Sequence, residues 1–441
     1  MITNTMSTSV HFDTCLSQLE EHLSDFVNDP GRDFTRHRLL DFKTLVKTLM
    51  ALNGKTLNNE LIDLFIHKDH IPSESALIQQ RNKLSSEALH YLLRSFQLPP
   101  TERQLFYGYR LLAVDGSGLQ IANDKEDLAS RHFGIGSNAP FNEIFVHSLY
   151  DILQQVYVDL TITKLHKNNE PRVFVDMLQE FKSDFPVIFI GDMNYSSFNV
   201  MAHIKSINQS FLLRTKDITS NGSASTFKLP DEDIFDLSLP DLTLTRLRTA
   251  EHTQDNNHLR YLARDSVFDF LSTKTKQNEN QFFQLPLRIV RFQITEDKYE
   301  TIYTNLDPVA FPLPVIKQLY TMRWGIETSF RRLKHTLGVV YTHSKKADFI
   351  FQEIFAKAIM FNFIAFCTAS IIRHKGKKGY SYTVNFSVAA NLCKKFFLET
   401  IDLLKLEENI FRQMNPIRPS KSFDRKKYKR NAFKSFMYRV A

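Results

Sequence analysis

Two short apolar runs, each ending in an aspartate, constrain the fold of this chain more than any other feature. The run RLLAV ends at Asp115, which glycines at 116 and 118 follow, and the run PVIFIG ends at Asp192. The first run has the length of a short strand, and the second is continuously apolar, as strands buried on both faces of a sheet are. We therefore predict an α/β fold in which two strand ends present carboxylates.

The elements around these runs alternate in a defined order. Residues 110–121, 144–153 and 155–165 are predicted strands, 173–181 a helix, 186–191 a strand, 196–207 a helix and 210–216 a strand. Three strands, helix, strand, helix, strand is the order of the ribonuclease H-like fold. A later helix that carries Glu327 can bring this glutamate to the sheet edge at which Asp115 and Asp192 lie.

The chain of 441 residues is long enough for two or three domains. Apolar residues recur at helical spacing through residues 10–98, where Ser73 or Ser75 is a candidate helix cap. Short alternating runs and an Asn-Gly turn at 221–222 predict a β-rich insertion. The predicted domains are a helical N-terminal domain (1–100), the first part of the ribonuclease H-like core (105–216), the β-rich insertion (217–304), the last core helices (305–375) and a basic helical C-terminal region (376–441).

One predicted helix, YTMRWGIETSFRRLK, carries four chemically distinct groups at residues 320–334. At about 100° per residue, Tyr320, Arg323, Glu327 and Lys334 share a stripe of roughly 60° on a regular helix. This arrangement surrounds one carboxylate with two cations and a phenol. A salt bridge between Arg323 and Glu327, which are four residues apart, is the structural alternative to a functional role for this pair.

The candidate metal ligands are Asp115, Asp192 and Glu327. Hard carboxylate oxygens suit Mg²⁺, for which Mn²⁺ can substitute, and two such ions about 3.5–4 Å apart promote phosphodiester cleavage and strand transfer. Each aspartate could instead be a turn or capping residue without a catalytic role. Three further acids are poorer candidates because they fall inside predicted strands or helices: Asp151, Asp159 and Asp176.

The spacing Y-x2-R-x3-E-x6-K, together with Asp115 in LLAVDGSGLQI and Asp192 in FPVIFIGDMNYSSF, resembles the insertion-sequence-four family of DDE transposases. The resemblance extends over most of residues 30–370. It implies a cut-and-paste DNA transposase whose N-terminal helices bind the inverted ends of its element and which acts as a homodimer on double-stranded DNA. It also implies that Asp115 lies between the two metal ions, while Asp192 and Glu327 each favour one of them.

The cations near Glu327 have an expected use in such an enzyme. We expect Arg323 and Lys334 to contact phosphates that flank the scissile bond and Tyr320 to donate a hydrogen bond to a phosphate. Further basic residues are expected to make positioning contacts with the DNA backbone: Arg331, Arg332, His335, His343, Lys345 and Lys346.

The family forms a DNA hairpin at the transposon end and holds an extruded base on an aromatic side chain of the insertion. The sequence departs from this pattern because its only tryptophan, Trp324, lies in the helical motif. Phe282, Phe283 or Tyr261 could stack a base in its place, and each could equally be a core residue.

Composition supports a nucleic-acid partner. The formal net charge is +8 and the pI about 9.1, and a basic, aromatic tail spans residues 412–441, although such a tail can also be a solubilising segment. Three well-separated cysteines predict a reducing compartment without disulfides. The apolar stretch 349–372 is interrupted by polar residues and is predicted to be a buried helix rather than a membrane span. With no secretory signal at the N-terminus, we expect a cytoplasmic, nucleoid-associated bacterial protein.

Two alternatives to a transposase remain at this point. One is a nuclease on the same fold that cuts DNA without joining it. The other is a transposase-derived DNA-binding protein without activity, against which the presence of all three carboxylates argues.

Overall fold

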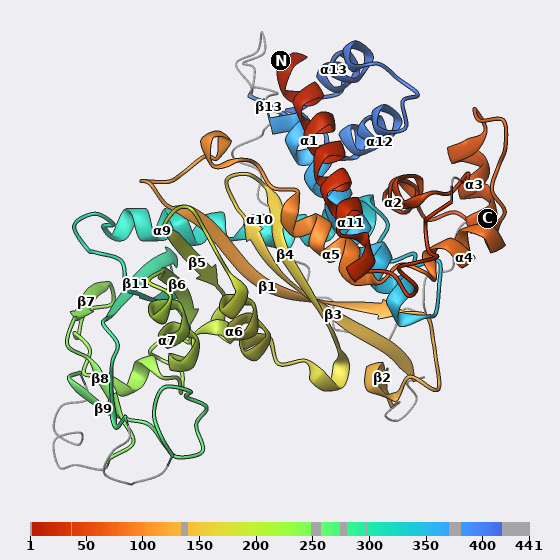
Figure 1. The fold of residues 1–441 in the computed structure, drawn as a ribbon. Coiled ribbons are helices and arrows are strands. Elements are labelled where there is room, and N and C mark those ends of the chain that lie inside the picture. Colours follow the sequence, from red (N-terminus) through yellow and green to blue (C-terminus); the bar gives the residue numbers. More distant parts are fainter. Residues whose placement is uncertain are drawn as a thin grey trace.

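The computed structural model describes residues 2–36, 38–133, 140–247, 257–273, 280–296, 298–369 and 381–416. The helices are α1 (Ile2–Glu21), α2 (Phe42–Ala51), α3 (Leu57–Phe65), α4 (Glu74–Arg81), α5 (Ser86–Ser95), α6 (Glu170–Glu180), α7 (Phe198–Ser206), α9 (Leu313–Met322), α10 (Trp324–Arg331), α11 (Ala347–Ala369), α12 (Phe386–Phe397) and α13 (Leu403–Arg412). The predicted basic tail, apart from residues 412–416, lies outside the described residues. Figure 1 shows the N-terminal helices gathered around α11 on one side of the molecule and the strands extending to the other.

The strands are β1 (Arg110–Ile121), β2 (Arg131–His132), β3 (Phe141–Asp151), β4 (Val156–Lys164), β5 (Val187–Gly191), β6 (Ser210–Thr215), β7 (Phe235–Leu239), β8 (Thr243–Thr245), β9 (Leu259–Tyr261), β10 (Phe282–Gln284), β11 (Leu287–Thr295), β12 (Lys298–Thr304), β13 (Tyr382–Thr383) and β14 (Asn415–Pro416). Nine of the described strands form one mixed sheet in the order β2-β3-β1-β5-β6-β12-β11-β7, with β4 also paired to β3. The α/β prediction is confirmed.

The centre of the sheet combines both strand orientations. β3 is antiparallel to β1 and to β4, whereas β1, β5 and β6 are parallel neighbours. Every residue of β5 is buried, as its uninterrupted apolar sequence predicts for a strand with both faces covered. The two aspartates that follow buried runs therefore come from adjacent parallel strands.

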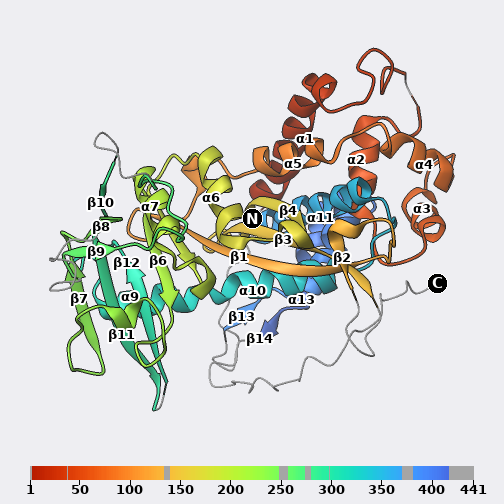
Figure 2. The same ribbon diagram turned by 90° about the horizontal axis from the view of Figure 1, so that it is seen from below.

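Two hydrophobic cores cover the two faces of this sheet. The first core packs Ala113 and Ile190 with residues of α9, α10 and α11. The second core packs Val114 and Phe189 with residues of α6 and α7. Figure 2 shows α6 and α7 on the opposite side of the sheet from α9 and α10. The side chain of each strand residue thus faces one helical layer or the other, in alternation.

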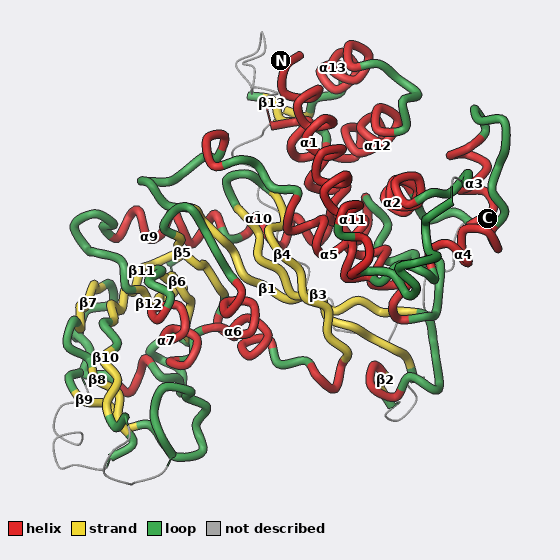
Figure 3. The backbone as a smooth tube through the Cα atoms, viewed as in Figure 1, coloured by secondary structure: helices red, strands yellow, loops and turns green. Residues whose placement is uncertain are grey.

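The segment predicted as a β-rich insertion divides between two sheets. β12 pairs with β6, β11 with β12 and β7 with β11, so these three strands continue the large sheet. β8, β9 and β10 form a separate three-stranded sheet. Figure 3 shows these strands together at one end of the molecule. The predicted boundaries of the insertion, residues 217 and 304, stay predictions.

The N-terminal helices are held to the rest of the chain by α11. Ser73 caps α4 by accepting from the backbone N–H of Ala76 at 3.2 Å. Arg81, at the end of α4, forms a buried ion pair with Glu353 of α11 at 3.0 Å. By length and composition alone, α11 is the one helix of the described chain that could cross a membrane, but 94% of its most apolar window is buried within the fold. It is a core helix.

Candidate active site

β1 and β5 place Asp115 and Asp192 on neighbouring strands. The predicted strand end at Asp115 is wrong, because β1 continues to Ile121 and pairs Asp115 with Ser148 of β3, whereas Asp192 does follow the last residue of β5. Val114 and Gly191 are paired residues in the parallel register of these strands, and each aspartate is the next residue of its chain. Asp115 stands two residues after Ala113, and Asp192 stands two residues after Ile190. Because Ala113 and Ile190 face the first core, both carboxylates point to the side of the sheet that holds α10.

Burial and the neighbouring charges shift the pKa of Asp115. Burial raises the pKa of its carboxyl group to about 7, the negative charges of Asp192 and Glu327 add to the rise, and Arg323 and the N–H of Gly116 oppose it. Asp192 accepts a hydrogen bond from the backbone N–H of Asn194 at 2.9 Å, which fixes the turn after β5. Asp192 and Glu327 therefore lie near enough to Asp115 for their charges to act on it.

α10 is docked on the sheet by contacts that orient Glu327. The hydroxyl of Tyr157 on β4 donates to Oγ of Ser329 at 2.9 Å, and Phe330 packs on the ring of Tyr157. Gly325 lies next to Tyr150 of β3, whose ring would be at ordinary contact distance, 3.7 Å, from an added Cβ. With this face of α10 buried, Glu327 is left half-buried beside Arg323, which donates to its Oε1 at 3.0 Å. The i, i+4 salt bridge anticipated from the sequence is present.

The motif at 320–334 does not lie on one regular helix. α9 ends at Met322, α10 begins at Trp324, and residues Arg332–Thr336 form a π-helical turn before Gly338 ends the helix with φ +78°. The prediction of a single stripe is therefore wrong for Lys334, because the wider turn changes the angle between successive side chains. Lys334 instead donates to the carbonyl of Gly118 on β1.

Two residues of this site have no signal in the sequence motif. Arg214 on β6 and Glu300 on β12 form an ion pair at 3.3 Å, on the face of the sheet that carries Asp115 and Asp192. Burial raises the pKa of the Tyr320 hydroxyl, Arg323 and Arg214 lower it and Glu300 raises it further, so these groups surround the phenol. Only the register of β6 with β12 reveals this arrangement.

A cavity of about 820 Å³ opens beside Asp192. Its lining includes Met193, Arg214, Lys216, Arg291, Tyr299 and Glu300. The guanidinium of Arg291 lies 4.1 Å from the centre of the Tyr299 ring. Asp217 and Asp233 also line the cavity and both pair with Arg291, so the cavity combines charges of both signs with an aromatic ring.

The remaining predicted DNA contacts do not gather at the carboxylates. Arg331 and Lys345 are exposed, while Lys346 is exposed and reaches Oδ1 of Asn82 in the N-terminal helices. His343 is held by Glu353 at 3.1 Å, and Arg332 lies 4.7 Å from the Phe386 ring centre. His343 and Arg332 therefore contact other residues of the protein.

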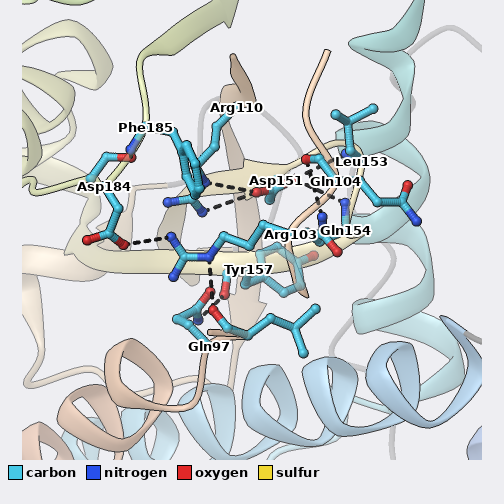
Figure 4. Close-up of polar contacts among 12 residues, drawn as sticks. Gln97, Arg103, Gln104, Arg110, Asp151, Leu153, Gln154, Tyr157, Asp184 and Phe185 are labelled. Carbon is cyan, nitrogen blue, oxygen red and sulfur yellow. Dashed lines mark hydrogen bonds and ion pairs between the residues drawn. The ribbon is translucent and has the colours of Figure 1, made fainter. Parts of the chain in front are cut away.

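The three poorer acidic candidates are used in ion pairs. Figure 4 shows Asp151 bonded to Arg110, at the opposite end of the β1 ladder from the candidate site, at 3.1–3.2 Å. Asp159 accepts from His90 at 2.6 Å. Asp176 pairs with Arg172 within α6 at 3.1 Å. Each has a structural partner.

The candidate stacking residues of the insertion lie in or beside the three-stranded sheet. Phe283 packs between Phe268 and Phe270, with ring centres 5.5 and 4.9 Å away, so it is a packing residue. Phe282 is 55% exposed, and Tyr261 is half-buried on β9.

The donor set fits a hard divalent cation. Within the described ranges, no three side chains of the His, Cys, Asp and Glu types are close enough to form a ready-made metal cage. Asp115 and Asp192 nevertheless repel each other, and Glu327 is neutralised by Arg323. A bound cation would relieve this repulsion, and carboxylate oxygens are the donors that Mg²⁺ and Mn²⁺ prefer.

Comparison with known proteins identifies the family of the chain. A search of curated proteins found no match. Among solved structures, the chain is similar to a piggyBac transposase synaptic complex with hairpin DNA, at a TM-score of 0.45 and 9% identity, over 96% of this chain and 88% of that chain. The family model described as "Transposase DDE domain" matches residues 106–363, which is more than half of the 441 residues and includes all three carboxylates. The chain therefore belongs to the DDE-domain transposases.

Proposed function

We propose that this protein is a cut-and-paste DNA transposase of the insertion-sequence-four type, which cleaves the ends of its element and transfers the 3′ hydroxyls to target DNA. One observation carries the proposal: two carboxylates project from adjacent parallel strands next to the paired residues Val114 and Gly191, and the charge of Glu327 on α10 acts on one of them. Phosphoryl transfer needs such a set of oxygen donors around the scissile phosphate.

The strand arrangement supports a ribonuclease H-like core. From β4 through β3 and β1 to β5 and β6, three antiparallel strands are followed by two that are parallel to β1. In chain order these are the third, second, first, fourth and fifth long strands of the core. We assign the core to this fold on that order and on the position of the aspartates.

Asp115, Asp192 and Glu327 would hold Mg²⁺ or Mn²⁺. When bound, these ions activate the attacking oxygen and stabilise the charge that develops on the phosphate. Arg323 neutralises Glu327 before DNA binds and can then turn its planar guanidinium to a phosphate, a geometry that suits Arg better than Lys. Tyr320 would donate to a phosphate nearby, and Lys334 would add a positive charge from the Gly118 side.

The cavity beside Asp192 is the proposed site for a base extruded from the transposon end. Its walls offer Arg214 and Lys216 for a phosphate, and Tyr299 with Arg291 for a stacked base. These residues are better placed than Phe282, Phe283 or Tyr261, because Met193 of the same cavity directly follows Asp192.

The partners of this activity are also proposals. The N-terminal helices would bind the inverted ends, with Arg331, Lys345 and Lys346 making backbone contacts, and two copies would pair on DNA so that both ends are processed together. The enzyme would work in the bacterial cytoplasm on the nucleoid. Its +8 net charge favours such a polyanionic partner.

The test needs the DNA that flanks the gene. Inverted repeats found there supply a labelled end substrate, to which the purified protein and Mg²⁺ are added. A transposase releases 3′ hydroxyls and joins them to a second DNA. Cleavage without joining identifies a nuclease, and binding without cleavage identifies an inactive DNA-binding protein, and either result contradicts the proposal.

A further inference from the structure

A second polar cluster lies behind Asp115, on the other face of β1. A Cβ added to Gly116 would lie 2.9 Å from Oε1 of Glu170 and 3.3 Å from Nδ1 of His147. Glu170 is the first residue of α6, and His147 is paired with Gly116 in the β1–β3 register. A glycine at 116 thus leaves room for these two side chains against the strand that carries Asp115, and a larger residue there would displace the end of Glu170.

Glu170 is connected to the turn that presents Asp192. The side-chain N–H of Asn194 donates to Oε2 of Glu170 at 3.0 Å, and the backbone N–H of the same residue donates to Oδ1 of Asp192 at 2.9 Å. Asn194 therefore bridges Glu170 and Asp192. The capping of α6 is done by Asn169, which accepts from the N–H of Arg172 at 3.2 Å, so Glu170 is not needed as the helix cap.

Two buried polar atoms face this cluster without a partner. His147 is 2% exposed and Tyr195 is 1% exposed, and across the described residues neither Nδ1 of His147 nor the Tyr195 hydroxyl has a hydrogen-bond partner. Nε2 of His147 is occupied by Thr163 at 2.9 Å. The Tyr195 hydroxyl lies within the combined field of Glu170, Asp115 and Asp192. Buried polar atoms are satisfied by solvent or ions when protein groups do not satisfy them.

We infer that Glu170 is a fourth carboxylate of the active centre, a positioning residue that accepts hydrogen bonds from water bound to the cation held by Asp115 and Asp192. This inference rests on the proposed metal site. Mg²⁺ keeps several of its waters when it binds a protein, and these waters need acceptors. The pairing of β1 with β5 ends at Val114, so β1 has an open edge at Asp115 and Gly116, and Glu170, with His147 and Tyr195 beside it, supplies acceptors around that edge.

The test is Mn²⁺ binding to the full-length protein without DNA, followed by the electron paramagnetic resonance signal of free Mn²⁺. Glu170→Gln keeps an acceptor for Asn194 but removes the charge, and it should weaken Mn²⁺ binding about tenfold. Glu180→Gln is the matched control, because Glu180 ends the same helix and contacts Arg94 at the surface. It should bind Mn²⁺ as the wild type does.

A second variant distinguishes the effect of the Glu170 charge from the effect of its contact with the turn after β5. Asn194→Ala removes the bridge to Asp192 and leaves the charge of Glu170, so it should retain most of the Mn²⁺ affinity. Wild-type affinity in Glu170→Gln, or an equal loss in Asn194→Ala, overturns the inference while the metal site stands. A wild-type protein that binds no Mn²⁺ overturns the proposed metal site and the inference with it. Melting temperatures in EDTA show that each variant is folded.

Discussion

The guanidinium of Arg323 donates to Oε1 of Glu327 at 3.0 Å and also lies close enough to Asp115 to lower the pKa of that carboxyl group. The positive charge of Arg323 therefore acts on two of the three carboxylates that we propose as metal ligands. Arg323 and a divalent ion compete for the same negative charge.

This competition gives the first prediction. Arg323→Gln should raise the Mn²⁺ affinity of the DNA-free protein by about three- to tenfold, because Glu327 loses its paired cation. The same change should slow DNA cleavage by about 100-fold, since a phosphate contact is lost. Arg331→Gln, on the exposed side of α10, is the control for the metal titration and should leave Mn²⁺ affinity nearly unchanged. Equal affinity in Arg323→Gln and wild type would show that the pair does not compete with metal.

Two glycines should respond in opposite directions to alanine. A Cβ at Gly191 would lie 3.0–3.1 Å from side chains of Leu213, Tyr195 and Val114, and we expect Gly191→Ala to lower stability by about 1–3 kcal/mol. A Cβ at Gly325 meets nothing closer than 3.7 Å inside a helix, so Gly325→Ala should be neutral or stabilising by up to about 1 kcal/mol. Urea unfolding of both variants measures these changes. A Gly191→Ala variant as stable as the wild type would contradict the close packing around Gly191.

Arg81 couples the N-terminal helices to α11. It is 1% exposed and bonds to Gln352, to Glu353 and to the carbonyl of Phe349 at 2.8–3.2 Å. Arg81→Leu leaves Glu353 buried without this partner and should cost about 3–5 kcal/mol. Arg94→Leu removes the pairs of a half-exposed guanidinium with Glu180 at 2.8 Å and Asp159 at 3.9 Å and should cost about 1 kcal/mol or less. Calorimetric melting of both variants measures the difference, and similar losses would argue against a structural role for the buried pair.

The stability of the fold should depend on pH through His90. Burial lowers the pKa of this imidazole, but hydrogen bonds to Asp159 and Glu87 outweigh burial and raise it to about 9 from 6.5. A raised folded-state pKa stabilises the fold fully below pH 6.5, and the contribution is lost as pH rises through 9. The stability difference between wild type and His90→Gln should therefore shrink from pH 6 to 9.5. His67→Gln, at an exposed position, should show no such trend. A constant difference for His90→Gln would contradict the assignment.

The sequence predicted those parts of the site that local pattern controls. The uninterrupted apolar runs placed Asp115 and Asp192 directly after buried strand residues, although only Asp192 follows a strand end. Ser73 caps its helix as expected, and Arg323 pairs with Glu327 because residues four apart lie one helical turn from each other. These features depend on neighbours in sequence, so a single sequence reveals them.

Other parts depend on contacts between distant segments. The pairing of β12 with β6 joins residues about 90 positions apart and brings Glu300 to Arg214. Glu170 lies against Gly116 because α6 packs on the sheet, and this glycine leaves space for its side chain. The π-helical turn that moves Lys334 has no marker in the residue types of the motif. No local periodicity contains this information.

The most direct test of the account compares Asp115→Asn, Asp192→Asn and Glu327→Gln with wild type in single-turnover cleavage of the element's own end DNA with Mg²⁺. Each change keeps the side-chain size and removes one charge, and each should slow cleavage by about 1000-fold or more while DNA affinity changes little. Asp176→Asn, which removes an acid paired with Arg172 on the surface, should cleave as the wild type does. Cleavage within about tenfold of wild type by any of the three variants would contradict the assignment of that carboxylate to the catalytic metal site.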